Sequence, residues 1–460
     1  MDIIAAIATG SAATAIGIVR ISGEGCFSLC DRVFHAANGR PFSGQTARTM
    51  VYGDMLDAEG RIIDRGLAVR FPAPRSYTGE DSAEFHCHGS PVVLRELLGT
   101  LFSAGARQAG PGEFTKRAFL NGRLDLTQAE AVIDLIDAET AAAARNAAAQ
   151  LDGGLRRVLL PIQDALLEII SRFYAVVDYP DEDIADIQPR QIADALESAD
   201  RHLTALLDTC RRGKILKSGV RTAIVGRPNA GKSSLLNALV GYDRAIVTSI
   251  PGTTRDTVED AAAVGDTLLR LIDTAGIHET ADAVEQLGVE RSRKAAEQAD
   301  LVIAVVDGTA GLTEEDRDIL ELAAAAPRWI LGASKSDLLP DGVSPVRTLP
   351  EGLRKPDASV SFSSVAPGGL QQLEAAVTAL FPAGDGGHAG ALLTDQRQED
   401  AAARARDAVR RAREALEGGL TPDAVLTDAE AALEALGELT GRTAREEIVS
   451  RIFSRFCVGK

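Results

Sequence analysis

The sequence contains few cysteines, and they are not arranged for cross-linking or for binding zinc. The 460 residues include five, without paired Cys-x-x-Cys spacing: Cys26, Cys30, Cys87, Cys210 and Cys457. An odd number of scattered cysteines favours free thiols in a reducing compartment over a disulfide framework or a zinc site. The composition therefore argues against a small secreted domain held together by disulfides.

Long apolar runs are absent as well. No uninterrupted apolar stretch reaches the roughly 18 residues that are needed to span a bilayer. The chain begins Met-Asp-Ile-Ile, with an acid where a secretory signal would carry positive charge. We therefore expect a cytoplasmic protein without a membrane anchor.

Positive charge is scarce relative to negative charge. The chain has 49 Lys and Arg against 66 Asp and Glu, which gives a formal net charge of −17. This balance argues against a general nucleic-acid coat protein. A local basic patch could still hold RNA, because the electrostatic attraction depends on nearby Lys and Arg. Charge alone neither indicates nor excludes RNA binding.

The length indicates about three domains, since domains commonly have roughly 100 to 200 residues. Residues 1–118 have the pattern of an α+β domain: apolar runs at Ile16–Ile21 and Leu67–Phe71 predict strands, and Pro91–Phe102 has the apolar spacing of a helix. Residues 218–382 alternate apolar strands with helices, which is typical of a mixed, mostly parallel sheet. Residues 119–217 and 383–460 carry apolar residues at helical spacing, after a Gly-rich linker at 383–390 in the second case. In the first piece, Asp125–Gln128 is a candidate helix start, and Gly153-Gly154 indicates a break between helices. Neither helical piece is self-sufficient. We therefore expect a multidomain α/β protein whose α/β domain is inserted into an all-α domain.

Three polar clusters leave alternatives open. Phe85-His86-Cys87-His88 suggests a metal site, but alternation on a strand would point both histidines one way and the thiol the other, so this is the minority hypothesis. Tyr77–Asp81 can be read as a polar turn. The acidic stretch Tyr179–Asp183 fits a solvated loop between helices better than a metal site.

The stretch Gly226–Ser233 matches the phosphate-binding pattern G-x-x-x-x-G-K-[ST]. It follows an apolar run, Thr222–Val225, and precedes a helical run, Ser234–Val240, which is the context that the motif requires. Glycines let backbone N–H groups surround phosphates, while Lys232 supplies a charge and Ser233 a hydroxyl for Mg²⁺. A Gly-rich turn with an exposed lysine is the alternative, but four further segments downstream argue against it.

The downstream segments follow in the order and spacing of a Ras-like GTPase domain. Gly252–Asp256 supplies a threonine for the metal shell. Asp273–Gly276 follows the apolar strand Leu268–Ile272, where an aspartate can hold Mg²⁺ through water. Asp337 can accept the N1 and N2 hydrogens of guanine, which adenine lacks, and Ser363–Val365 can present a backbone N–H to the base.

Three positions depart from the usual GTPase pattern. Ser334 stands where an asparagine precedes Lys335, and Val365 stands where a lysine is usual, so we expect guanine specificity with reduced affinity. Ile277 stands where Ras-like proteins have the glutamine that orients the attacking water. Another group must then take that role. The candidates are Asn229, as a ligand of a monovalent cation, and Glu285, for which an exposed acid on a helix is the alternative.

Short stretches outside the nucleotide segments are typical of one family. They lie toward both ends of the chain: Ile18–Gly23, Tyr77–Asp81, His88–Gly89, Pro111–Phe114, Arg117–Asn121 and Phe456–Lys460. With the five nucleotide segments, they make the chain similar from end to end to the tRNA-modification GTPases of the MnmE (TrmE) family. A generic GTPase would share only the middle third.

The resemblance implies an N-terminal domain that binds formyl- or methylene-tetrahydrofolate and forms a homodimer, a discontinuous helical domain and an inserted G domain. It also implies an FAD- and NADH-using partner of the MnmG (GidA) type, joined in a heterotetramer. Together they would add an aminomethyl or carboxymethylaminomethyl group at C5 of the wobble uridine, position 34, of certain tRNAs.

The resemblance also assigns roles to residues of this sequence. The GTP-binding set would be Asn229, Ala230, Gly231, Lys232, Ser233, Ser234, Thr248, Ser249, Ile250, Pro251, Gly252, Thr253, Thr254, Asp273, Thr274, Ala275, Gly276, Ser334, Lys335, Asp337, Ser363, Ser364 and Val365. The folate would be held by Arg20, Glu84, Arg123 and Lys460. Arg123 stands where a lysine can occur, so a carboxylate would meet a fork of donors.

By the same resemblance, a K⁺ ion bridges two G domains and replaces an arginine finger, bound by Asn229, Thr248, Ile250 and Thr253. Mg²⁺ would be held by Ser233 and Thr254. Three residues would be catalytic: Lys232, Glu285, which aligns the attacking water, and Cys457, a functional thiol near the modification chemistry. His278 receives no role.

Other functions remain open from the sequence. The chain could be a GTP-dependent switch in ribosome assembly or signalling, or a folate and tRNA scaffold with a regulatory G domain. Cys457 could instead be a small buried apolar residue or an inert thiol.

Overall fold

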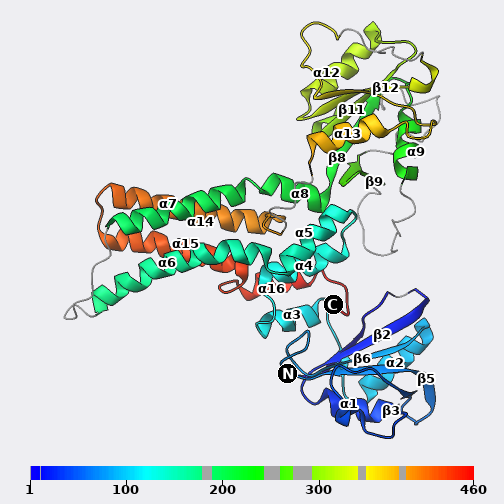
Figure 1. Cartoon of the computed structure of the whole chain (residues 1–460), viewed down its shortest axis with the longest axis vertical. Coiled ribbons are helices and arrows are strands. Elements are labelled where there is room, and N and C mark those ends of the chain that lie inside the picture. Colours follow the sequence, from blue (N-terminus) through cyan, green and yellow to red (C-terminus); the bar gives the residue numbers. More distant parts are fainter. Residues whose placement is uncertain are drawn as a thin grey trace. The chain divides into compact units, whose positions relative to one another are not determined.

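The structure is a computed structural model of the chain. It describes residues 2–10, 12–178, 189–242, 260–272, 293–339, 349–382 and 390–460. The chain folds into two compact units, each built from stretches that are distant in sequence, as the colours of Figure 1 show. Unit 1 comprises Met1–Ile133, Gln150–Asp200 and Ala401–Lys460, and unit 2 comprises Asp134–Ala149 and Arg201–Asp400.

Unit 1 contains a seven-stranded sheet in the order β3-β4-β5-β6-β2-β1-β7. Neighbouring strands are antiparallel, except that β1 and β7 are parallel. The predicted strands at Ile16–Ile21 and Leu67–Phe71 are confirmed, within β2 and β5. The strands are β1 Ile4–Ile7, β2 Thr14–Ser22, β3 Phe34–Ala36, β4 Val51–Leu56, β5 Ile62–Phe71, β6 Ser82–Gly89 and β7 Arg107–Gln108.

One face of this sheet carries an apolar core and packs against two helices, α1 Cys26–Val33 and α2 Pro91–Ser103. Because side chains alternate along a strand, Val19, Phe85 and their neighbours point toward the helices, and the residues between them point to the opposite face. The predicted helix at Pro91–Phe102 is confirmed. It begins where Ser90 accepts a hydrogen bond from the Val92 N–H, next to a proline in the first turn.

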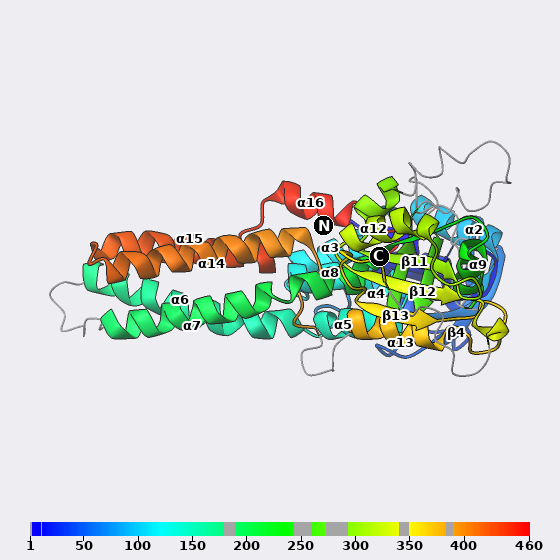
Figure 2. The ribbon, with the colours of Figure 1, turned by 90° about the horizontal axis from the view of Figure 1, so that it is seen from above.

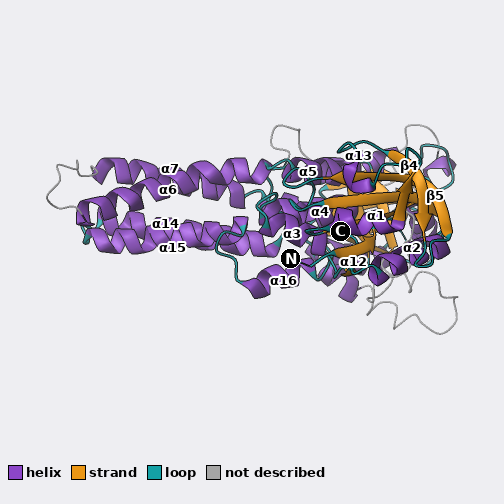
Figure 3. Cartoon of the chain, turned by 90° about the horizontal axis from the view of Figure 1, so that it is seen from below, coloured by secondary structure: helices purple, strands orange, loops and turns teal. Residues whose placement is uncertain are grey.

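Helices form the rest of unit 1, and Figures 2 and 3 show α6, α7, α14 and α15 running side by side. Stretches on either side of the α/β segment meet here: the Gln163 amide donates to the Leu436 carbonyl at 3.2 Å, and Arg410 pairs with Asp200 at 2.8 Å. The helices before and after the α/β segment are α3 Glu113–Leu120, α4 Leu126–Ile136, α5 Ala141–Leu151, α6 Gly154–Asp178, α7 Pro189–Leu207, α14 Gln396–Glu417, α15 Pro422–Thr440 and α16 Glu446–Phe453.

The predicted helix boundaries at Asp125 and Gly153 are confirmed by local hydrogen bonding and backbone geometry. The Gln128 N–H donates to the Asp125 carboxylate at 2.9 Å, and the Asp125 N–H donates to the Gln128 side chain at 3.0 Å. This reciprocal pair satisfies N–H groups at the start of α4. Gly153 adopts a left-handed conformation, with φ of 82°, between α5 and α6.

Unit 2 contains a six-stranded sheet in the order β13-β12-β11-β8-β10-β9. Its pairs are parallel apart from the β9–β10 hairpin, so the predicted mixed, mostly parallel sheet is confirmed. The strands are β8 Val220–Gly226, β9 Asp260–Val264, β10 Thr267–Leu271, β11 Leu301–Asp307, β12 Trp329–Ser334 and β13 Ala358–Ser361.

Apolar cores lie on both faces of this sheet. One contains side chains of α9 Lys232–Tyr242 and α13 Gln371–Leu380, and the other contains side chains of α12 Arg317–Ala325. Burial on both faces explains why β11 and β12 are almost continuously apolar. In the described part of the chain, no helix combines the length and apolar character needed to cross a membrane.

Some helical residues belong to unit 2 instead of unit 1: residues 134–149, which include the end of α4 and most of α5, the end of α7, the start of α14, and α8 Cys210–Ser218. Lys217 of α8 pairs with Asp134 at 2.8 Å, and Arg145 pairs with Asp266 of the β9–β10 turn at 3.0 Å. The domain boundaries at residues 118, 217 and 382 stay predictions.

Gly213 of α8 provides a test of the packing in unit 2. A Cβ at this position would lie 2.1 Å from the Leu393 carbonyl oxygen. Gly213→Ala should therefore lower the free energy of unfolding by about 1–3 kcal/mol, although alanine favours helices. Trp329, the only tryptophan, is fully buried in unit 2, so its fluorescence during urea unfolding reports on this unit.

Gly241 of α9 is the matched control, because a Cβ there would meet nothing within 4 Å. Gly241→Ala should leave the stability of unit 2 unchanged or raise it by up to about 1 kcal/mol. Equal effects of the two substitutions would contradict the close approach of Gly213 to Leu393.

Candidate functional site

The P-loop lies between β8 and α9, so the predicted strand, loop and helix context is confirmed. Two residues of the loop have left-handed backbone conformations, Asn229 with φ of 63° and Gly231 with φ of 99°. The Lys232 ammonium folds back and donates to the carbonyls of Gly226 and Arg227, both at 2.7 Å. Burial lowers the pKa of Lys232. The loop therefore holds a partly buried cation beside the N-terminus of a helix, which is suited to an anion.

Gly226 is required by a neighbouring strand. A Cβ there would lie 2.4 Å from the Val305 carbonyl oxygen of β11. The glycine thus allows β8 and β11 to pair in register up to the residue where the loop begins.

Arg227 of the P-loop makes contacts that the sequence did not predict. Its guanidinium donates to the Thr313 hydroxyl at 3.0 Å and forms an ion pair with Glu315. Thr313 and Asp316 form a capping box at the short helix η2 Glu314–Asp316. The pattern [ST]-x-x-[DE] at 313–316 was the available signal for this turn, but the pairing with Arg227 joins residues far apart in sequence.

The end of β12 lies beside the P-loop. The Ser334 hydroxyl donates to the Ala230 carbonyl at 2.6 Å, and its distance to the Val306 carbonyl is 3.1 Å. Lys335 follows in a left-handed conformation, and its ammonium pairs with Asp307 at 2.5 Å. Hydrogen bonds from Lys335 and Thr309 lower the pKa of Asp307 to about 2.

The two remaining segments that are predicted to bind the base lie at the same end of the sheet. Asp337 is exposed in the short helix η3 Ser336–Leu338. The Ser336 N–H donates to the Phe362 carbonyl at 3.1 Å, which connects this loop to the segment after β13. There Ser363 is buried and accepts hydrogen bonds from the N–H groups of Val365 and Ala366.

The structure thus brings these predicted residues to one edge, at the carboxyl ends of β8, β12 and β13: Asn229, Ala230, Gly231, Lys232, Ser233, Ser234, Ser334, Lys335, Asp337, Ser363, Ser364 and Val365. Open parallel sheets bind ligands at this edge. The other predicted residues lie outside the described residues: Thr248, Ser249, Ile250, Pro251, Gly252, Thr253, Thr254, Asp273, Thr274, Ala275, Gly276, Ile277, His278 and Glu285.

A second group of predicted residues meets in unit 1. Arg20 of β2 lies directly opposite Glu84 of β6 and pairs with it at 2.8 Å. The Arg20 guanidinium also lies over two aromatic rings, 5.6 Å from the centroid of Tyr77 and 5.7 Å from that of Phe114. Such contacts add cation–π attraction to the ion pair. The group presents a cation, a carboxylate and two rings in one place.

The other two predicted folate residues lie next to this group. The Phe114 N–H donates to the Lys460 carbonyl at 3.2 Å. Arg123 approaches Gly79, two residues after Tyr77: a Cβ on Gly79 would lie 3.2 Å from the Arg123 Cγ. Lys460 thus contacts the backbone of Phe114, and Arg123 lies beside the loop that carries Tyr77.

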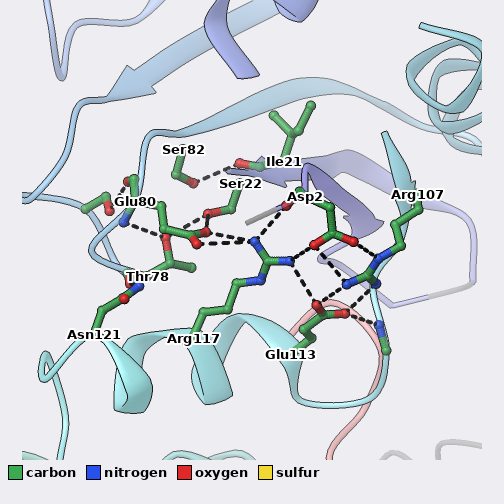
Figure 4. A network of polar contacts seen from close by, with 12 residues as sticks. Asp2, Ile21, Ser22, Thr78, Glu80, Ser82, Arg107, Glu113, Arg117 and Asn121 are labelled. Atoms are coloured by element: carbon green, nitrogen blue, oxygen red, sulfur yellow. Dashed lines mark hydrogen bonds and ion pairs between the residues drawn. The ribbon is translucent and has the colours of Figure 1, made fainter. Parts of the chain in front are cut away.

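A buried arginine holds the loop beside this group, as Figure 4 shows. Arg117, only 4% exposed, donates to Glu80 at 3.0 Å, to the Asp2 carboxylate at 2.8 Å and to Glu113 at 3.0 Å. Burial would raise the pKa of Glu113, but hydrogen bonds from Arg107, a backbone N–H and Arg117 lower it to about 2. These ionic contacts fix the loop that carries Thr78 and Glu80. Sequence analysis identified Arg117 only as part of a family motif.

The C-terminal tail completes unit 1. The Gly112 N–H donates to the Cys457 carbonyl at 3.3 Å, and Val458 forms a bridge with Pro111. Gly459 has φ of 101°, and a Cβ on it would lie 2.2 Å from the Ile7 carbonyl oxygen. Cys457 is exposed, whereas the other four cysteines are buried, so the alternative that it is a buried apolar residue is wrong.

The residues His86, Cys87 and His88 do not form a metal site. Cys87 is buried in the core face of β6, while His88 pairs with Asp64 at 2.9 Å on the other face, as the alternation predicted. Within the described ranges, no cluster of three or more His, Cys, Asp or Glu side chains could hold a metal ion.

Two family models match the chain: "GTP-binding protein TrmE N-terminus" over residues 3–123 and "MnmE helical domain" over residues 126–457. Among curated proteins, the "tRNA modification GTPase MnmE" of Heliobacterium modesticaldum is 43% identical, covering 100% of this chain and 99% of that protein. The protein of the same name from Symbiobacterium thermophilum is 44% identical with the same coverage.

A solved structure is also similar in part. A variant of Aquifex aeolicus Era bound to GDP·AlF4⁻ aligns with 41% of this chain and 65% of that chain, at 25% identity and a TM-score of 0.25. The full-length relatives and the two family models establish the relationship by themselves. The chain belongs to the MnmE family of tRNA modification GTPases.

Proposed function

We propose that this GTP hydrolase works through K⁺-dependent pairing of two G domains, residues 218–382, and that it modifies the wobble uridine of certain tRNAs. With an FAD- and NADH-using partner of the MnmG type, it adds an aminomethyl or carboxymethylaminomethyl group at C5. The one-carbon unit comes from formyl- or methylene-tetrahydrofolate bound by unit 1. The observation that carries the nucleotide part is the meeting of the P-loop and the Lys335–Asp337 loop at one sheet edge.

The P-loop suits a nucleoside triphosphate. Lys232 is a partly buried cation that donates to two backbone carbonyls, and phosphate oxygens would be stronger acceptors for it. Ser233 follows it in the first turn of α9, where its hydroxyl can serve Mg²⁺. Bound Mg²⁺ and K⁺ would neutralise charge on the phosphate oxygens. The backbone N–H groups of Asn229–Ser233 would orient those oxygens.

Asp337 supports guanine specificity, because its exposed carboxylate can accept the N1 and N2 hydrogens. Asp337→Asn would replace one of these acceptor contacts by a donor. GDP affinity should fall by at least about tenfold, since hydrogen bonds to charged groups contribute about 1.5–3 kcal/mol. Xanthosine diphosphate should gain affinity, because its C2 oxygen can accept from the new amide. Equilibrium titration of both nucleotides checks this, and unchanged GDP affinity would remove Asp337 from the base site.

Potassium is the proposed substitute for the missing glutamine at position 277. Asn229 supports this role, because it lies in the P-loop with a left-handed backbone and offers an amide oxygen as a ligand. GTP hydrolysis should rise at least about tenfold when K⁺ replaces Na⁺. In other GTPases, an arginine finger that neutralises the same transition-state charge raises kcat by more than this.

Asn229→Gly is the matched variant, because glycine keeps the left-handed backbone while the substitution removes the side chain with its amide oxygen. It should retain GDP binding and lose the response to K⁺. Hydrolysis that is equally fast in Li⁺ and K⁺, with no G-domain pairing in GDP and aluminium fluoride, would contradict this mechanism.

The Arg20 group supports folate binding. A reduced folate has a flat ring with N–H donors and an anionic tail. Glu84 offers an acceptor for the ring, whereas Arg20, Arg123 and Lys460 offer cations, beside the rings of Tyr77 and Phe114. The exposed thiol of Cys457, in the tail that ends at Lys460, is available to the modification chemistry.

Homodimerisation is supported by the sheet face opposite α1 and α2. The register aligns Tyr52 with Leu67, Leu67 with His86 and His86 with Ile18, so one row crosses four strands. Tyr52 is 54% exposed and Ile16, at the end of the face, is 61% exposed. Apart from His86 this row is apolar, and apolar side chains gathered on one exposed face favour contact with another protein surface.

Leu67→Glu tests this face, because a charge in the middle of an apolar interface would be desolvated without a partner. The variant should elute with the mass of one 48.4 kDa chain, whereas the wild type should have twice that mass. Val92→Glu is the control, since Val92 is 61% exposed on α2, on the helix-covered side. Light scattering would contradict the proposal if both variants behaved alike.

A further inference from the structure

Ser334 ends β12 and is almost completely buried, with 2% of its surface exposed. Its hydroxyl lies 2.6 Å from the Ala230 carbonyl of the P-loop and 3.1 Å from the Val306 carbonyl of β11. One side chain therefore joins the start of the base-binding loop to the phosphate-binding loop and to the strand between them.

Gly231 makes this contact possible. A Cβ on Gly231 would lie 3.2 Å from both the Cβ and the Oγ of Ser334, which is closer than ordinary packing. The P-loop can approach the end of β12 because it has no side chain at this position. The position of the P-loop thus depends on a hydrogen bond as well as on the chain connection to β8 and α9.

The hydroxyl group has one proton, and both neighbouring groups are acceptors. A proton donated to Ala230 or Val306 is not available for the base. The N7 atom of guanine is an acceptor only, so it needs a donor that Ser334 no longer has. An asparagine side chain, by contrast, carries two N–H donors and could serve a carbonyl and the base together.

We propose that Ser334 is a positioning residue that ties the base-binding loop to the P-loop and makes no hydrogen bond to N7 of the base. The inference rests on guanine nucleotide binding at this edge, as proposed above. The two residues of the loop then have different roles. Asp337 accepts the N1 and N2 hydrogens of guanine, and Ser334 holds the phosphate and base subsites at a fixed separation. This role also explains how serine can replace the usual asparagine at position 334, since the contact with the P-loop needs only one donor.

The test compares GDP with 7-deaza-GDP, in which a C–H group replaces N7. The full-length wild-type chain should bind the two nucleotides with equal affinity, within about twofold. Ser334→Ala should weaken both by the same factor, about fivefold, which is the size of one net hydrogen bond. Ser334→Asn should bind GDP more tightly than the wild type and should prefer GDP over 7-deaza-GDP by about fivefold.

Ser359→Ala is the matched control, because Ser359 is exposed on the neighbouring strand β13. It should leave both affinities unchanged. Folding of each variant is checked by urea unfolding with Trp329 fluorescence. If Ser334→Ala does not fold, the wild-type ratio and the Ser334→Asn variant still decide the question.

A wild-type preference for GDP of fivefold or more would overturn the inference, because Ser334 or its neighbours would then donate to N7. Unchanged affinities in folded Ser334→Ala would overturn the positioning role. Failure of the wild type to bind either nucleotide would overturn the proposed guanine site itself, and the inference with it.

Discussion

The parallel register of β8, β11 and β12 is the constraint on which the nucleotide site depends. Gly226 pairs with Val305, and Asp307 pairs with Ser334, so the three strands end within one or two residues of one another. The loops that follow must therefore leave the sheet at the same edge. The P-loop and the Lys335–Asp337 loop, more than 100 residues apart in sequence, therefore become neighbours, and the Ser334 hydroxyl joins them.

In unit 1, ion pairs rather than strand register hold the loop of the candidate site in place. Its antiparallel sheet places Arg20 opposite Glu84, but the loop carrying Thr78 and Glu80 is held by Arg117, which serves three carboxylates at once. Removing one partner from such a buried group leaves the others uncompensated, and this costs more than the loss of a surface ion pair. The two candidate sites thus differ in what positions their loops: strand register positions the loops of the first, and a buried set of opposite charges positions the loop of the second.

The sequence predicted features whose causes are local. The P-loop context, the capping residues at Asp125 and Gln128 and the alternation along His86, Cys87 and His88 each depend on a few neighbouring residues, and each is confirmed. It did not predict contacts that join distant segments, because no periodicity encodes them. The hydrogen bond from Arg227 to Thr313 is one such contact.

Ser334 shows the same difference between local features, which the sequence predicts, and long-range contacts, which it does not. Sequence comparison with the usual pattern identified a departure, and the expected consequence was weaker guanine binding. Only the structure reveals which group its hydroxyl contacts, since Ala230 lies about 100 residues earlier in the chain. The predicted site residues outside the described ranges, Glu285 among them, stay predictions that rest on the family resemblance.

The C-terminal tail packs against the first strand, so this contact must wait until the end of the chain has been synthesised. Gly459 lies against Ile7, and the Lys460 carbonyl accepts the Phe114 N–H, so the packing around Phe114 needs residues that leave the ribosome more than three hundred positions later. Contacts of such high sequence separation slow folding, because a long loop must be closed before they form. During translation, the contact between Phe114 and the tail can therefore form only after Lys460 has been added.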